Sequence, residues 1–339
     1  MTAKRVVVIG GSSGALEVVR RIAAQLPAGL RAAVCVVLHT APESPGVLPS
    51  VIGKTTALPT RSAETGMRLD NGRIYVAPPD HHLVIEPGQL RITRGPKENC
   101  FRPAIDPLFR SAGQVYGPGA IGIVLSGDLD DGTAGLWALR QMGGVAIVQD
   151  PAEALFPSMP SSAIRHVAAD HVVASVRIAP LLERLLEASA DESRRIAVPA
   201  PLEVEMKIAN EENPAEAGLR DVAAPSPFAC PECHGVLLRL KAIPQLRFRC
   251  HTGHAYSAAS LMAAIDEGIE DALWSAVRAL NEAELLLTTL GTHRHEGGVS
   301  AGPESVASKV ERVRRQAEAV RGVILARGST SREDAETLS

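Results

Sequence analysis

The sequence has no excess of basic residues and no long apolar run. Its 35 lysines and arginines are balanced by 38 acidic residues, for a formal net charge of −3, so the composition gives no indication of nucleic-acid binding. No uninterrupted hydrophobic segment is long enough to span a bilayer, and the first residues lead into an apolar strand rather than a signal peptide. We therefore expect a cytoplasmic protein that binds no nucleic acid and inserts into no membrane.

Cysteine is also scarce, with five residues in a chain of 339. An odd number of cysteines without an export signal argues against a disulfide framework. Cys35 lies within an apolar run and is expected in the core, Cys100 is isolated, and the other three cluster in the C-terminal half. The length and the 45% share of hydrophobic residues allow two domains, at least one with a large core.

A glycine-rich turn follows the first apolar segment. The β-branched residues 6–9 and the helical spacing of apolar residues after position 15 predict a strand, a tight turn and a helix. The turn has the form Gly-x-Ser-x-Gly, at Gly10, Ser12 and Gly14, which can hold a serine hydroxyl beside the free N–H groups of a helix N-terminus. Taken alone, such a turn favours a dinucleotide phosphate loop, and a nucleophilic Ser12 is the alternative.

The segments that follow predict an α/β fold with a doubly wound, mostly parallel sheet, in a domain at 1–189. Apolar runs typical of buried strands recur, and helical patterns lie between them. These runs lie at 34–38, 120–125, 144–150 and 171–176, and a closing helix is expected at 181–186. Short strands at 82–85 and 89–92 are expected to form a β-meander-like insertion with 73–77.

Polar side chains follow three of these strands. Ser12, His39 and Asp131 each come after a parallel strand, and the carboxyl ends of such strands share one edge of the sheet. A serine hydroxyl becomes a nucleophile when a neutral imidazole accepts its proton, and a carboxylate fixes the tautomer of that imidazole. The three residues therefore predict a triad for acyl transfer to water, with the N–H groups of Ser13 and Gly14 binding the oxyanion. Helix capping is the alternative role of Asp131.

The order of these residues argues against two common enzyme classes. The α/β hydrolases have the order Ser, Asp, His, whereas here the histidine precedes the aspartate. A Rossmann reductase would have an acidic residue after its second strand, where this chain has His39.

The C-terminal half contains a compact motif at 228–256. A Cys-x-x-Cys pair is followed after sixteen residues by a third cysteine and, four residues later, by a histidine. This spacing indicates a zinc ribbon with a structural, tetrahedral zinc site, and a redox pair is the alternative. His251 is adjacent to a cysteine ligand and is expected to point elsewhere. The expected ligands are Cys230, Cys233, Cys250 and His254.

The stretches around this motif are of three kinds. Residues 190–227, rich in charge, alanine and proline, are interpreted as a linker with room for one short strand or helix near 202–208. Residues 257–327 carry two amphipathic helical patterns that predict a hairpin, which is a usual dimerisation element, so we expect a homodimer. Residues 328–339 are expected to be a disordered tail.

The first half also carries a specific set of motifs: Ile-Gly-Gly-Ser-Ser-Gly at 9–14, Val-Leu-His at 37–39, Tyr-Val-Ala-Pro-Pro at 75–79, Arg-Pro-Ala-Ile-Asp at 102–106, Leu-Ser-Gly at 125–127, Asp-Gly at 131–132 and Phe-Pro-Ser-Met-Pro at 156–160. Over residues 4–186 they resemble the catalytic domain of the CheB-type chemotaxis protein-glutamate methylesterases. The resemblance implies that Ser12 is the nucleophile, His39 the base and Asp131 the orienting acid, with no cofactor for catalysis. It also implies hydrolysis of glutamate γ-methyl esters, and deamidation of certain glutamines, on the helices of a chemoreceptor-like partner.

Two departures from the family pattern affect this expectation. Members commonly carry an N-terminal receiver domain, and because this sequence starts at the first strand we expect no control by a fused receiver. Where classical members have a methionine, this chain has Asp128, whose charge near the oxyanion would weaken anion stabilisation. The second hypothesis is therefore a catalytically weak or inactive scaffold that binds signalling partners through its ribbon and helices, which resemble the C-terminal extensions of stand-alone relatives.

Overall fold

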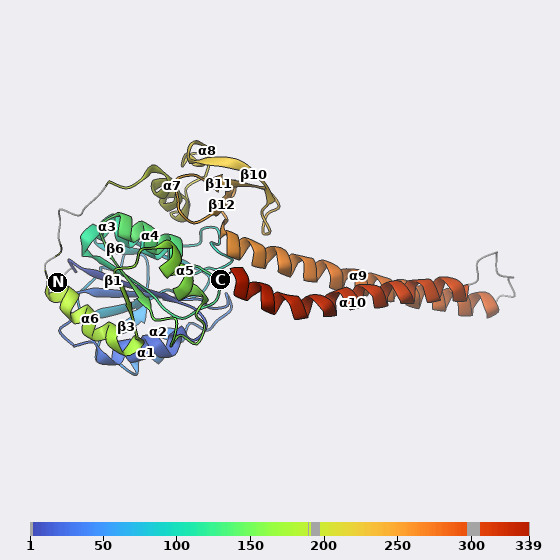
Figure 1. The fold of residues 1–339 in the computed structure, drawn as a ribbon, viewed down its shortest axis with the longest axis horizontal. Coiled ribbons are helices and arrows are strands. Elements are labelled where there is room, and N and C mark those ends of the chain that lie inside the picture. Colours follow the sequence, from blue (N-terminus) through green and yellow to red (C-terminus); the bar gives the residue numbers. More distant parts are fainter. Residues whose placement is uncertain (1–2, 189, 191–196, 297–305, 339) are drawn as a thin grey trace. The chain divides into compact units, whose positions relative to one another are not determined.

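The computed structural model describes residues 3–188, 190, 197–296 and 306–338 (Figure 1). The chain forms two compact units, residues 1–261 and 262–339, which are described separately below.

A seven-stranded, wholly parallel sheet forms the centre of the first unit, in the order β3-β4-β2-β1-β7-β8-β9. Its strands are β1 (Val6–Gly11), β2 (Ala33–Leu38), β3 (Thr60–Ser62), β4 (Arg73–Val76), β7 (Ala120–Val124), β8 (Val145–Gln149) and β9 (His171–Val173). Strand β1 has β2 on one side and β7 on the other, so the strand order reverses there. In open α/β sheets ligands bind at the carboxyl ends of the strands at such a switch point.

Helices cover both faces of this sheet, so the predicted doubly wound α/β fold is confirmed (Figure 1). One face carries α1 (Ala15–Gln25), α2 (Leu48–Gly53) and α6 (Ser175–Glu187), and the other carries α3 (Ile105–Tyr116), α4 (Thr133–Gln141) and α5 (Ser158–His166). Along β1, Val7 and Ile9 pack on the first face, whereas Val6 and Val8 pack on the second. Burial on both faces explains why this strand is apolar throughout.

Two details of the sheet differ from the prediction. The β-meander was predicted wrongly, because β5 (His82–Glu86) and β6 (Gln89–Thr93) form a two-stranded hairpin, whereas β4 pairs in parallel with β2 and β3. The predicted strand at 171–176 is also too long, since α6 already begins at Ser175. The Glu153 carboxylate accepts the N–H of Ser175, and this hydrogen bond satisfies a free donor at the start of that helix.

Residues 197–261 add two helices and a second sheet to the same unit. The helices are α7 (Ala200–Ala209) and α8 (Leu219–Val222), and the antiparallel sheet comprises β10 (Ala223–Ala229), β11 (Val236–Leu240), β12 (Arg247–Cys250) and β13 (Ala255–Ser257). The stretch interpreted as a linker thus contains both helices and the start of β10, although residues 191–196 lie outside the described residues. Residues 223–257 are called the ribbon below.

The second unit is a pair of helices. Helix α9 spans Ala258–Glu296, of which residues 258–261 belong to the first unit, and α10 spans Val306–Leu338. Helix α10 covers all of the expected tail except residue 339, which lies outside the described residues. Arg314 and Arg327 of α10 form ion pairs of 2.7 and 2.8 Å with Glu284 and Asp266 of α9. None of the helices in the described ranges combines the length and apolarity that crossing a membrane requires.

Candidate active site

Ser12 lies in the turn between β1 and α1, at the switch point of the sheet. Its N–H donates to the carbonyl of Ser126, 3.0 Å away, and its carbonyl accepts from the N–H of Ala15 at 3.1 Å. Gly14 precedes α1 with a φ of 77°, and a Cβ there would lie 2.9 Å from Ser126 Oγ, so the position requires glycine. The N–H groups of Ser13 and Gly14 make no hydrogen bond with the described part of the chain.

His39 follows β2 on the neighbouring strand. Gly11 of β1 is in register with Leu38 of β2, so Ser12 and His39 occupy the next position of adjacent strands. His39 Nε2 lies 2.8 Å from Asp131 Oδ2, and both side chains are at most 3% exposed. The ring of Phe101 stacks on the imidazole with centroids 3.7 Å apart. The other ring nitrogen, His39 Nδ1, is buried and has no hydrogen-bond partner among the described residues, so a bond to Ser12 is not formed here.

Asp131 accepts hydrogen bonds on both carboxylate oxygens. His39 Nε2 and the Ile105 N–H contact Oδ2, while Asn99 Nδ2 and, at 3.4 Å, the Asp106 N–H contact Oδ1. Burial on its own would raise the pKa of Asp131, but the hydrogen bonds from His39, Ile105 and Asn99 outweigh it and lower this pKa. An ionised carboxylate only accepts, so Nε2 carries the ring proton and the lone pair of a neutral His39 lies on Nδ1.

The helix-capping alternative for Asp131 is realised at a different helix. Helix α4, which follows in sequence, begins after Gly132, and no side chain of the described residues caps it. The N–H groups that Asp131 accepts, from Ile105 and Asp106, belong to the first turn of α3. The same carboxylate therefore satisfies free donors of α3 and holds the imidazole of His39.

The loop after β7 packs tightly against the serine turn. A Cβ on Gly127 would lie 2.0 Å from Met159 Sδ and 2.9 Å from Ser12 Cβ. The Gly127 N–H donates to the Phe156 carbonyl at 3.0 Å, and the Met159 N–H donates to the Gly127 carbonyl at 2.9 Å. The motif at 156–160 thus supports the Ser12 turn through Gly127. Asp128, expected near the oxyanion, is an exposed residue of this loop.

Sequence reasoning missed Asn99 and Phe101, which contact the aspartate and the histidine. They belong to a turn in which Asn99 and Cys100 have φ values of 51° and 72°. Such turns are usually signalled by Asn-Gly, and the cysteine in the second position removes that signal. The contact between Asn99 and Asp131 joins residues 32 positions apart, which no local pattern reveals.

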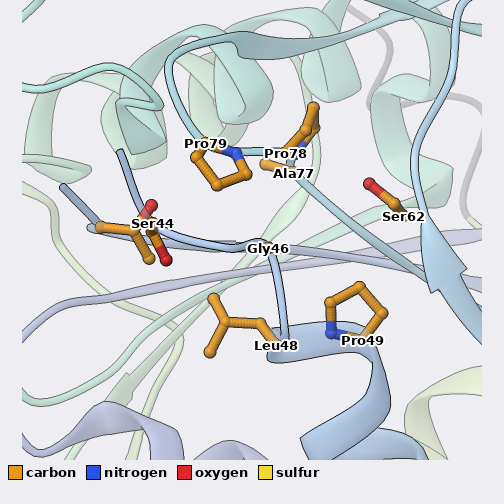
Figure 2. A pocket seen from close by; sticks show the side chains of 9 residues that line it. Ser44, Gly46, Leu48, Pro49, Ser62, Ala77, Pro78 and Pro79 are labelled. Atoms are coloured by element: carbon orange, nitrogen blue, oxygen red, sulfur yellow. The ribbon is translucent and has the colours of Figure 1, made fainter. Parts of the chain in front are cut away.

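A small hollow opens at the same edge of the sheet (Figure 2). In Figure 2, Leu48 and Pro49 lie across it from Pro78 and Pro79. Thr40, the residue after His39, also lines this hollow. All the residues that line this hollow are uncharged.

The four expected metal ligands lie together in the ribbon. The ligand atoms of Cys230, Cys233, Cys250 and His254 are all within 4.8 Å of one another. The Cys233 and Cys250 sulfurs are 3.6 Å apart, and His254 Nδ1 lies 3.6 Å from Cys250 Sγ and 3.7 Å from Cys230 Sγ. Zinc–sulfur bonds of about 2.3 Å in a tetrahedron place two sulfurs roughly 3.8 Å apart. The group therefore can hold a metal ion.

Comparison with known proteins finds relatives of the N-terminal half of the chain. The family model described as CheB methylesterase matches residues 7–182. A protein of Leptospira interrogans is 36% identical over 180 residues, which are 53% of this chain and 93% of that protein. Protein-glutamate methylesterase/protein-glutamine glutaminase 3 of Anaeromyxobacter dehalogenans is 38% identical over 180 residues, 52% of this chain and 53% of that protein.

A solved structure is similar as well. The CheB methylesterase catalytic domain of Thermotoga maritima is 30% identical, with a TM-score of 0.51 over 55% of this chain and 99% of that domain. The fold and the matched motifs define an α/β enzyme of the methylesterase class. The chain belongs to the CheB methylesterase family, as its motifs predicted.

Proposed function

We propose that this chain is a serine hydrolase that removes methyl groups from glutamate γ-methyl esters of a chemoreceptor-like protein. The observation that supports it is the buried pair of His39 and Asp131, whose hydrogen bond leaves the unpartnered Nδ1 lone pair next in register to Ser12. Hydrogen bonds of catalytic groups are often long without substrate and shorten when substrate binds. Ser12 is half-buried, so an extended ester side chain can reach its hydroxyl.

The reaction proceeds by acyl transfer. Ser12 Oγ attacks the γ-carbonyl carbon while His39 Nδ1 takes the hydroxyl proton, and Asp131 stabilises the imidazolium that forms. The free N–H groups of Ser13 and Gly14, at the start of α1, donate to the oxyanion. The C–O bond of the ester breaks, and the proton on His39 leaves with methanol.

Water completes the cycle. His39 removes a proton from a water molecule that attacks the glutamyl ester on Ser12. As the acyl bond breaks, this proton passes to Ser12 Oγ, which restores the hydroxyl and leaves a glutamate γ-carboxylate on the receptor. The same steps deamidate a glutamine when ammonia, rather than methanol, is the leaving group. The relatives that are named for both activities support this pairing.

Replacement of Ser12 tests the proposal. We expect Ser12→Ala to lower methanol release from a methylated receptor by several orders of magnitude. Ser50→Ala, at an exposed position of α2, is the matched control and should retain full activity. Equal rates for wild type and Ser12→Ala, with no labelling of Ser12 by a serine-reactive phosphonate, would instead favour the scaffold hypothesis.

We also infer that the group of three cysteines and one histidine holds a structural zinc ion. The short separations between its ligand atoms support four-coordinate binding that leaves no open position. Metal analysis should find about one zinc per chain, retained in Ser12→Ala and lost in Cys230→Ser together with part of the thermal stability. A wild-type protein without zinc would rule this out.

We propose in addition that the hairpin of α9 and α10 mediates homodimerisation. Leu285, Leu286 and Leu325 are between 60% and 76% exposed, whereas Val277 and Ala317 are buried. An exposed apolar surface of this kind favours association. Light scattering should give the mass of a dimer, and a monomeric mass at all concentrations would contradict the proposal.

A further inference from the structure

The turn at residues 98–101 lies between the catalytic residues and the ribbon. Its ends are joined by hydrogen bonds of 3.2 and 2.9 Å between the backbones of Glu98 and Phe101. Phe101 stacks on His39, and Asn99 donates to Asp131. One tight turn therefore contacts both members of the histidine–aspartate pair.

Asn99 is buried and uses its full hydrogen-bonding capacity. Its Nδ2 donates to Asp131 Oδ1 at 2.8 Å and to Asp106 Oδ2 at 3.0 Å. Its Oδ1 accepts from the Ser257 N–H at 3.0 Å and from Ser260 Oγ at 3.2 Å. Because two carboxylates accept from one end of the amide and an N–H donates to the other, the amide has a single satisfied orientation.

The ribbon also contacts the turn through a backbone hydrogen bond and through ion pairs. The Asn99 N–H donates to the Ala255 carbonyl of β13 at 2.8 Å. The Glu98 carboxylate is paired with Arg247 at 2.6 Å and with Arg249 at 2.9 Å, both in β12, and all three side chains are at most 1% exposed. Separating buried, hydrogen-bonded charges is costly. The turn is thus anchored to β12 and β13.

The residue before the catalytic carboxylate is held from the same side. Asp130 Oδ1 accepts from Ser257 Oγ, and its Oδ2 accepts from Gln245 Nε2, both at 2.6 Å. Ser257 thus contacts Asp130 directly and contacts Asp131 through Asn99. Both neighbouring carboxylates depend on residues beyond the parallel-sheet domain.

We propose that Asn99 is a positioning residue through which Ser257 and Ser260 hold the Asp131 carboxylate against His39. The ribbon and the start of α9 are then part of the framework of the active site. The inference rests on the proposed function, since the reaction that Asp131 serves is the one proposed above. A shift of a catalytic group by about 1 Å can cost roughly 100-fold in rate.

The variant Asn99→Ala tests this role. We expect kcat to fall about 10- to 100-fold with KM little changed, because Asn99 touches Asp131 and not the substrate. The proton on His39 Nε2, which is shared with Asp131, should give a downfield NMR resonance in wild type that moves or broadens in Asn99→Ala. Asn213→Ala, at an exposed loop position, is the matched control and should change neither quantity.

Three outcomes separate the possibilities. A lower kcat with a displaced proton resonance, in a protein that melts cooperatively, supports the positioning role. A melting temperature that falls while kcat and the resonance stay at their wild-type values overturns it, because Asn99 would then only stabilise the fold. An inactive wild type would contradict the proposed function, and the proton resonance would still decide the role of Asn99.

Discussion

At the scale of single residues, the site depends on which nitrogen of His39 carries a proton. Asp131 is ionised, because hydrogen bonds lower its pKa in spite of burial, so it accepts the proton-bearing Nε2. The basic nitrogen is then Nδ1, for which the described part of the chain supplies no hydrogen-bond partner. An unpaired buried nitrogen is costly, and the catalytic role that we propose for His39 would explain why it persists.

The variant Asp131→Asn should therefore inactivate the enzyme without creating a cavity at position 131. An asparagine amide turned toward Nε2 would favour the opposite tautomer, in which Nδ1 carries the proton and cannot accept one from Ser12. We expect kcat to fall by roughly 10⁴-fold. The measurement is methanol release, with Asp150→Asn as the control at a half-buried position, where the asparagine oxygen can still accept the Ala152 N–H. A loss below tenfold would contradict the assigned tautomer.

At the scale of elements, the loops that follow different strands of the parallel sheet pack closely against one another. The loop after β7 reaches the Ser12 turn at Gly127, and the segment at 156–160 closes over the same glycine. Parallel strands bring these loops to one edge, but their fit decides where the hydroxyl lies.

Gly127→Ala should disturb Ser12 directly. The new methyl group would lie 2.9 Å from Ser12 Cβ and 3.1 Å from its backbone nitrogen, so the turn would have to move. We expect kcat to fall at least tenfold and the melting temperature to drop by several degrees. Gly29→Ala, where a Cβ meets nothing within 4 Å, should leave both unchanged. An unchanged kcat in Gly127→Ala would show that the turn tolerates the shift.

At the scale of the whole first unit, a buried charge cluster joins the parallel-sheet domain to α7 and the ribbon. Three arginines and three carboxylates, all at most 1% exposed, form ion pairs with one another: Arg110, Arg247, Arg249, Glu98, Asp106 and Glu205. The cluster is balanced in formal charge, so its members depend on one another.

The free energy of unfolding of this unit should therefore decrease at acid pH. Burial on its own would raise the pKa of Glu205, but Arg247, Arg110 and Arg249 lower it from 4.5 to about 2. A carboxylate with a lowered folded-state pKa stabilises the protein above its unfolded pKa, and this contribution is lost as pH falls from about 4.5 to about 2. Urea unfolding should show a free energy of unfolding that decreases through this window.

Two variants of α7 separate this contribution from general acid effects. Glu205→Gln removes one of the three carboxylates that balance the three buried arginines and should cost about 3 kcal/mol at pH 7, with a smaller pH dependence below 4.5. Glu203→Gln, exposed on the same helix, should match wild type. If both variants show the wild-type pH dependence, the lowered pKa of Glu205 is not what stabilises the unit.

Part of this protein could be predicted from local pattern alone. The apolar run of β1, the glycines at 10 and 14, and the positions of Ser12, His39 and Asp131 after apolar strand segments predicted the fold and the edge where those residues lie. The same holds for the group of three cysteines and His254. These features can be predicted because a window of a few residues contains both the hydrophobic periodicity and the end of a strand.

The tertiary structure decided what holds that site together. Asn99 lies on a turn without a glycine signal, and Ser257 and Arg247 lie in a ribbon that the sequence presented as a separate module beyond a linker. Their contacts span 32 to 158 positions, and they form because burial leaves each carboxylate and amide no water to bond with. Local sequence carries the tendency to form strands and turns, whereas the pairing of buried polar groups exists once distant segments have packed.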